Sequence, residues 1–171
     1  MGVDIALLLL RVTVGGTLAA HGAQKLFGWF GGSGLRGTAA GFEKLGYRPG
    51  LPMAFLGGLG EAGGGTLLAL GLLTPLAAAA GIGVMLNAII SVHLPKGFWN
   101  MKGGFEFPLT IATVFAAIGF SGPGRFSVDR SLGLHTSWQW GVGALALGCF
   151  SGITTLMLRA RAMRRPSATT D

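Results

Sequence analysis

Five long apolar segments limit what this chain can fold into. They cover about residues 5–27, 51–73, 76–94, 105–120 and 138–158. A helix needs about 20 mostly apolar residues to cross a bilayer, and the fourth segment is the shortest of the five. In lipid, only helices and closed barrels satisfy every backbone hydrogen bond, and these runs are too long and too uniformly apolar for barrel strands. The sequence therefore predicts an all-α integral membrane protein.

The connections between the segments predict their arrangement. Thr74-Pro75 leaves so little room that the second and third segments must form an antiparallel hairpin. The first loop is glycine-rich at both ends and includes a short amphipathic stretch at 38–45. We expect a four-helix transmembrane bundle in 1–132, a fifth, C-terminal transmembrane helix within 133–158, and a basic, disordered cytoplasmic tail in 159–171.

The basic residues predict the orientation in the membrane. Ten Lys and Arg residues lie on one side, with four in 25–48, two in 96–102 and four in 159–165, whereas the other side carries Arg125 and Arg130. The positive-inside rule then places the N-terminus outside and the C-terminus in the cytoplasm, in the plasma or inner membrane of a cell. The net charge of +7 forms no basic stripe interleaved with aromatics, so we expect a lipid bilayer as partner and no nucleic acid.

Polar and ionisable residues sit inside or at the ends of the first four apolar segments, and the fifth segment has no charged residue between 138 and 158. Such groups are costly in hydrocarbon, so they usually face a bundle interior or a water-filled cavity and mark functional sites. They are Arg11, His21, Lys25, Glu61, Asn87, His93 and Glu106.

Arg11 and Glu61 are expected to form a structural ion pair. Counted by helical rise, Arg11 lies about 10 Å from the outer end of the first segment and Glu61 about 15 Å from the inner end of the second. In a core about 30 Å thick, these depths differ by roughly one helical turn. A functional alternative makes Glu61 a proton acceptor whose pKa is set by burial against Arg11. Gly60 and Gly64, spaced as GxxxG, would let a partner helix approach closely.

A second group of polar residues gathers near the inner face. His21 and Lys25 share one helix face, while His93 ends the third segment and Glu106 begins the fourth. We expect a small-molecule site here, in which His21, Lys25, Asn87, His93 and Trp99 bind the ligand and Glu61 and Glu106 relay protons. The alternative is that Lys25 snorkels to the interface and Trp99 belongs to an aromatic belt.

Several motifs, in this order, resemble the DoxX family of small membrane proteins. They are Leu10-Arg11-Val12, His21-Gly22-Ala23-Gln24-Lys25-Leu26-Phe27-Gly28, Gly60-Glu61 with Gly63-Gly64-Gly65, the turn from Gly71 to Pro75, His93 with Gly97-Phe98 and Glu106, and Gly122-Pro123-Gly124 with Ser127-Val128-Asp129. The resemblance covers about 4–132 and implies a four-helix bundle. It also implies a link to quinones or oxidative stress, because some relatives are subunits of thiosulfate:quinone oxidoreductase and others belong to membrane-associated oxidative-stress complexes.

A membrane quinone suits the inner group of residues. Its two carbonyls need hydrogen-bond donors such as His or Lys, and its reduction takes up two protons that a Glu can relay. The redox step is missing from this chain, since Cys149 is the single cysteine and no dinucleotide-binding or Fe–S motif is present. We therefore expect a quinone-interacting subunit or anchor that receives electrons from a partner protein, rather than a self-sufficient enzyme.

Two alternatives stay open for the function. In the first, the chain is a non-catalytic scaffold that recruits soluble redox proteins through its basic inner loops. In the second, His21 and His93 ligate a haem or, together with Glu61 or Glu106, a metal. The second alternative is weakened because each candidate ligand is solitary in the sequence, with no second ligand at HxxxH or ExxH spacing. No metal ligand set is therefore assigned.

The fifth segment carries a stripe of small residues, Ala144, Gly148 and Gly152. Such a stripe lets another helix approach closely. We expect this helix to lie at the periphery and to serve assembly with a partner or a second copy. The alternative is that the stripe docks onto the first or fourth segment of the same chain.

Overall fold

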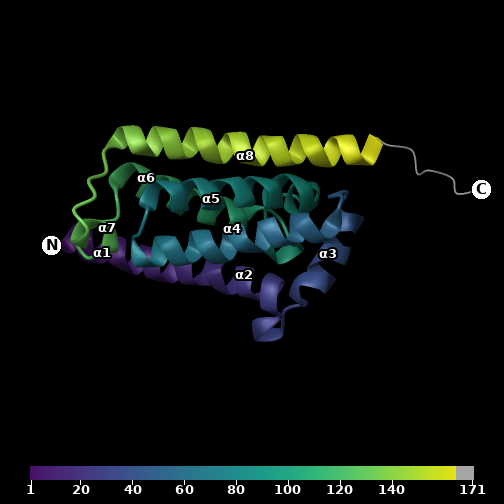
Figure 1. Ribbon diagram of the computed structural model, residues 1–171, viewed down its shortest axis with the longest axis horizontal. Helices are drawn as coiled ribbons and strands as arrows, with labels where there is room; N and C mark the ends of the chain where they lie inside the picture. The colour runs from purple at the N-terminus through teal and green to yellow at the C-terminus, as the bar shows by residue number, and fades with distance from the viewer. Residues whose placement is uncertain (165–171) are drawn as a thin grey trace, which may run out of the picture.

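The computed structural model describes residues 1–164, and this part of the chain is helical with no strand (Figure 1). A π-helical turn, Arg11–Gly15, joins the first two helices into one rod, and a second, Ile89–His93, extends the fifth helix. The α-helices are α1 (Gly2–Leu10), α2 (Gly16–Phe27), α3 (Gly34–Lys44), α4 (Gly50–Leu70), α5 (Thr74–Ala88), α6 (Glu106–Ser121), α7 (Val128–Ser131) and α8 (Trp138–Arg164).

Four helical rods are long and apolar enough to cross a membrane: Gly2–Phe27, Gly50–Leu70, Thr74–Lys96 and Trp138–Arg164. The all-helical membrane fold is therefore confirmed. The predicted number of five such helices is not reached, because α6 has only 16 residues and spans about 24 Å. The segment expected as an additional C-terminal transmembrane helix is α8, which is one of the four rods and the longest helix in the described chain.

Helix α5 lies at the centre and packs against α4, α6 and α8. The close contacts depend on small residues. A Cβ at Gly81 would collide with the Phe115 ring of α6, and one at Gly64 would come within 3.0 Å of the Ala80 side chain. The main core cluster is apolar and is formed by Leu18, Leu68, Ala77, Ile82, Met85, Ile111, Phe115 and Ile118.

Helix α8 docks on its own chain, against α5 and α6. Its stripe Ala144, Gly148 and Gly152 is buried, and a Cβ at Gly148 would lie 2.8 Å from both the Ala79 carbonyl oxygen and the Ile82 Cβ. This corrects the expectation that the stripe is kept for a partner. The alternative, that the stripe docks onto the fourth segment of the same chain, is correct for α6, but the contact with the central α5 was not predicted.

The two ends of the bundle differ in charge. The N-terminus and α7 lie at one end, and α3 and the C-terminal end of α8 lie at the other (Figure 1). Helix α8 continues to Arg164, so 159–164 of the predicted disordered tail is helical, whereas 165–171 lies outside the described residues. The basic loops thus gather at the end that includes α3, which we call the inner end, and the end with the N-terminus and α7 is called the outer end.

Candidate functional site

An inner cavity of about 520 Å³ lies between α4, α5 and α8. Known small-molecule sites have volumes of about 300–1,000 Å³, mostly apolar walls and a few convergent polar groups. The walls here are mostly apolar, with Leu56, Val84 and Leu158 among them. Seven polar residues also line the cavity. They are Lys25 of α2, Tyr47 of the loop after α3, Glu61 of α4, Asn87 of α5, His93 of the π-helical extension of α5, and Ser151 and Thr155 of α8.

Lys25 and Glu61 form an ion pair in the wall of this cavity. Glu61 is only 5% exposed, and Lys25 donates to its Oε1. The second carboxylate oxygen, Oε2, is buried and has no hydrogen-bond partner within residues 1–164. A buried acceptor without a partner is costly, so a donor that a ligand brought to this oxygen would be stabilising.

The predicted ion pair between Arg11 and Glu61 is wrong. Arg11 is fully buried and donates to the carbonyl oxygens of Ala69, at 3.2 Å, and Phe126. The packing of α2 on α4 explains the error, because a Cβ at Gly15 would meet the carbonyl of Gly65 and the amide of Ala69. In this register Arg11 contacts Ala69, near the outer end of α4. Ala69 is eight residues from Glu61, or about 12 Å along the helix.

Asn87 lines the cavity and also ties three segments together. Its amide nitrogen donates to the carbonyls of Gly83, at 3.0 Å, and Gly152, at 3.2 Å, which links α5 to α8. Its Oδ1 accepts a hydrogen bond from the Tyr47 hydroxyl at 2.8 Å, and that hydroxyl lies 2.6 Å from Ser91 Oγ. Much of its hydrogen-bonding capacity is therefore used within the protein.

Tyr47 lines the cavity from the loop after α3. Burial raises the pKa of its hydroxyl above the ordinary value, and the Ser91 hydrogen bond and the nearby Arg159 charge offset part of this effect. The hydroxyl therefore stays protonated at neutral pH and can donate to Asn87. Arg159 of α8 holds the same loop, since its guanidinium lies 5.6 Å from the Tyr47 ring centroid and donates to the Leu45 carbonyl at 2.6 Å.

Four of the predicted site residues line the cavity, namely Lys25, Glu61, Asn87 and His93. His93 donates from Nδ1 to the Gly103 carbonyl at 2.7 Å, so Nε2 of the neutral ring is an acceptor and donates only when the imidazole is protonated. The π-helical turn that carries His93 also carries Ser91, and such turns occur frequently at functional sites.

The other predicted residues lie elsewhere. His21 is exposed on α2, where its ring centroid lies 6.2 Å from that of Phe107. Trp99 is 63% exposed and packs edge-on against Phe98. Glu106 accepts a hydrogen bond from the Asn100 amide at 2.9 Å and thereby orders the loop before α6. None of the three lines the inner cavity.

Sequence reasoning missed Tyr47, Ser151 and Thr155. Tyr47 is the single tyrosine of the chain, but it lies in a loop, where no hydropathy pattern reveals that it folds back over α5. Ser151 and Thr155 lie four residues apart in α8, in line with the small-residue stripe. That spacing was the available signal that α8 forms part of the cavity wall.

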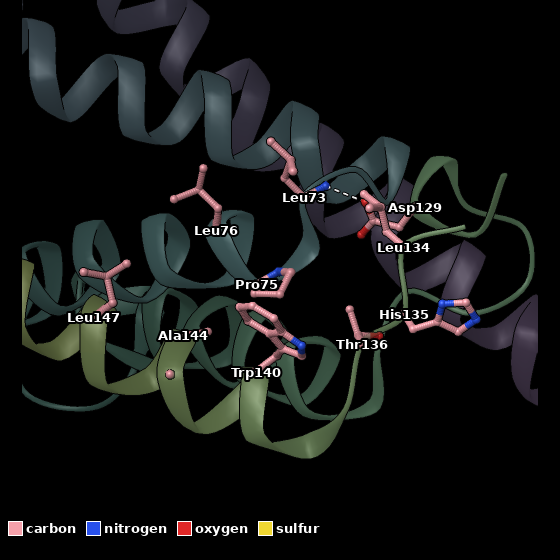
Figure 2. A pocket seen from close by; sticks show the side chains of 11 residues that line it. Leu73, Pro75, Leu76, Asp129, Leu134, His135, Thr136, Trp140, Ala144 and Leu147 are labelled. Atoms are coloured by element: carbon pink, nitrogen blue, oxygen red, sulfur yellow. Dashed lines mark hydrogen bonds between the residues drawn. The ribbon is translucent and has the colours of Figure 1, made fainter. Parts of the chain in front are cut away.

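Asp129 organises the outer end of the bundle and was also missed as a site residue. It is 1% exposed and accepts hydrogen bonds from the amides of Leu73, at 2.7 Å, and Thr74, at 3.0 Å, as well as from the Thr74 hydroxyl. Figure 2 shows the bond from Leu73, whose φ of 47° is unusual for a side chain of this size. Asp129 therefore holds the strained turn between α4 and α5.

The chemistry available in the inner cavity is hydrogen bonding and proton exchange. Lys25 can donate to a carbonyl, the protonated His93 ring can donate from Nε2, and Glu61 can accept from a hydroxyl or take up a proton. Within residues 1–164, no three His, Cys, Asp or Glu side chains are grouped so that they could hold a metal ion. His21 and His93, the proposed haem ligands, do not share the cavity.

Comparisons with known proteins agree with the motif resemblance. The family model described as DoxX matches residues 6–94. An uncharacterized membrane protein of Mycobacterium tuberculosis, Rv3486, is 35% identical over 101 residues, which cover 53% of this chain and 62% of that protein. The match thus spans less than two thirds of the relative. No solved structure matches the chain.

Proposed function

This chain belongs to the DoxX family of membrane proteins, and we propose that it binds the head group of a membrane quinone in the inner cavity, as a subunit or anchor of an oxidoreductase. The observation that carries this proposal is the Lys25–Glu61 pair, with its buried carboxylate, in the wall of a mostly apolar cavity, and with Glu61 Oε2 lacking a partner within residues 1–164. A quinone and its quinol need opposite hydrogen-bonding partners, and this pair offers both.

The donors suit the oxidised form of the ligand. A quinone carries two carbonyl oxygens and no hydroxyl hydrogen, so it binds through donors. Lys25 supplies one from α2, and His93, on the extension of α5, supplies a second from Nε2 when its imidazole is protonated. Ser151 is less suited to this role, because its hydroxyl donates to the Gly148 carbonyl at 3.0 Å.

The acceptor suits the reduced form. Reduction of the quinone to the quinol takes two electrons, supplied by a redox cofactor of a partner protein, and two protons. Glu61 can accept a hydrogen bond from the quinol hydroxyl through Oε2, and Lys25 stabilises the carboxylate while the quinol is bound. Glu61 is thus placed to exchange a proton with the ligand, and Lys25 keeps the buried charge balanced.

The proposal includes an orientation in the membrane. We place the protein in the plasma or inner membrane of a cell. Its N-terminus is then outside and its C-terminus in the cytoplasm, because the basic loops gather at the inner end. Helix α6 then forms a fifth, short crossing. It starts beside the end of α5, where the Glu106 amide donates to the Phe98 carbonyl, and leads to Arg125, whose amide donates to Asp4 near the N-terminus.

Quinone binding by the purified protein tests the proposal. Glu61→Gln, Lys25→Met and His93→Ala should each weaken binding by about tenfold, since an unmatched buried donor or acceptor costs about 1–3 kcal/mol. Glu43→Gln, Lys44→Met and His21→Ala are matched controls outside the cavity and should bind as the unaltered protein does. Equal affinity in all six variants, each shown to be folded, would overturn the proposal.

A further inference from the structure

A second, outer cavity lies at the other end of α5 and α8. It has a volume of about 500 Å³, and its walls include Leu76 and Pro75 of α5 and Trp140 and Leu147 of α8. Figure 2 shows Trp140 beneath Pro75, and Leu76 and Leu147 further along the same two helices. The polar group buried in this wall, Asp129, already accepts three hydrogen bonds from Leu73 and Thr74. His135 and Thr136 are its other polar lining residues, so the outer cavity is mostly, not wholly, apolar.

The two cavities lie over the same strip of α5. Leu76 lines the outer cavity, and Ala80, Val84 and Asn87 line the inner one. These positions are spaced by three or four residues and so share one helix face. The opposite faces of α5 are covered by α4, α6 and α8, and Ala77, Ala78 and Ile82 are buried there.

Helix α8 follows the same pattern. Trp140, Ala144 and Leu147 line the outer cavity, and Ser151, Thr155 and Leu158 line the inner one, again at intervals of three or four residues. The two cavities thus follow one another along the seam between α5 and α8, and no residue lines both. The inner cavity holds the Lys25–Glu61 pair, and the α5 residues that line the cavities from Val84 to Leu76 are apolar.

We propose that the two cavities join into one groove along this seam and that the groove holds the polyprenyl tail of the quinone, with the tail running from the inner cavity to the outer cavity and ending near Trp140. This inference rests on the proposed function. The occupant must be polar at one end and apolar along the rest, because the groove has one polar end and a mostly apolar remainder. Asn87 and Leu76 lie eleven residues apart, or about 17 Å along α5, which corresponds to an extended chain of several isoprene units.

Two photoreactive quinones test the path of the tail. One carries a diazirine beside the ring, and the other carries it on the last carbon of a tail of four isoprene units. With purified protein in lipid nanodiscs, the ring probe should label peptides that line the inner cavity. The tail probe should label 73–76 and 140–147, and an excess of unmodified quinone should suppress both.

The outcomes separate this inference from the proposed function. Ring labelling away from the inner cavity would overturn the proposed function. Ring labelling at the inner cavity, with tail labelling spread over lipid-exposed residues such as Val12 and Leu109, would overturn only the tail path. Tail-site labelling that phospholipid suppresses and quinone does not would identify the groove as a lipid site and would also overturn the tail path.

A plugging variant gives an independent measurement. Leu147→Trp fills the outer cavity, whereas Leu145→Trp places the same ring on the same helix outside both cavities. Leu147→Trp should weaken binding of a quinone with four isoprene units about fivefold, or about 1 kcal/mol, without affecting a quinone with one unit. Equal effects of the two variants on both quinones would contradict the tail path.

Discussion

Lys25 and Glu61 form an ion pair that joins the end of α2 to the middle of α4 across 36 residues of sequence. The lysine side chain is 30% exposed and the glutamate side chain 6% exposed. The carboxylate is therefore less hydrated than the ammonium group and depends more on the ion pair for its stability. A buried charge without its partner is strongly destabilising. The same pair that supports the bundle therefore also forms the polar end of the inner cavity.

The ion pair can be tested by a double-mutant cycle. Lys25→Met and Glu61→Leu should each lower the free energy of unfolding by about 1.5–3 kcal/mol, the usual worth of a hydrogen bond to a charged group. The double variant should lose less than the sum. Arg11→Leu and Glu61→Leu serve as the control cycle, and their effects should add because the two residues bind different partners. Additive losses for Lys25 and Glu61 would contradict the pairing.

The outer turn depends on Asp129. Asp129→Asn replaces one of its two acceptor oxygens by a donor, so it should lower the free energy of unfolding by about 1–3 kcal/mol. Thr74→Val removes the hydroxyl that donates to Oδ2 at 2.7 Å, and its effect should largely disappear when Asp129→Asn is already present. Arg130→Gln, at the exposed neighbouring position, is the control. Thermal unfolding in detergent measures all four, and an unchanged Asp129→Asn protein would refute this role.

Tyr47 predicts a dependence of stability on pH. Because burial raises the pKa of the folded-state hydroxyl, its stabilising effect is fully present below the ordinary tyrosine pKa of about 10 and is lost as the pH rises through the folded-state value. Tyr47→Phe should therefore be less stable than the unaltered protein at pH 8 by about 1 kcal/mol. The difference should shrink above about pH 10. A difference that grows with pH would contradict the raised pKa.

The docking of α8 can be tested with paired glycine substitutions. Gly148→Ala would place a methyl group 2.8 Å from the Ala79 carbonyl oxygen, whereas Gly143→Ala on the same helix meets nothing within 4 Å. We expect Gly148→Ala to lower the melting temperature and to loosen α8, seen as faster proteolysis or hydrogen exchange there. Gly143→Ala should leave both unchanged. Equal behaviour of the two variants would mean that α8 does not dock through this face.

Hydropathy predicted the helices well for a physical reason. A segment that enters lipid must satisfy its backbone hydrogen bonds internally and must be apolar over the thickness of the hydrocarbon core. Each segment can therefore be recognised from its own sequence, without knowledge of its neighbours. The predicted bounds 51–73 and 138–158 lie close to Gly50–Leu70 and Trp138–Arg164. The short amphipathic stretch expected at 38–45 is part of α3, Gly34–Lys44.

Partner choice could not be predicted in the same way. The partner of Arg11 depends on the register of α2 on α4, which is set by backbone contacts at Gly15 and Gly65 and not by distance from the membrane surface. Tyr47 reaches the cavity from a loop, and the position of α8 depends on which helix has a complementary face. These are properties of pairs of segments, so no single segment reveals them.

Redox-induced infrared difference spectroscopy tests most directly whether a quinone binds beside the Lys25–Glu61 pair. Reduction of the bound quinone to the quinol should change the carboxyl bands of Glu61, through a new hydrogen bond or a proton transfer. The change should be present in the unaltered protein and in Glu43→Gln and absent in Glu61→Gln. Identical carboxyl bands in the unaltered protein and Glu61→Gln, with quinone bound to both, would show that the quinone lies elsewhere.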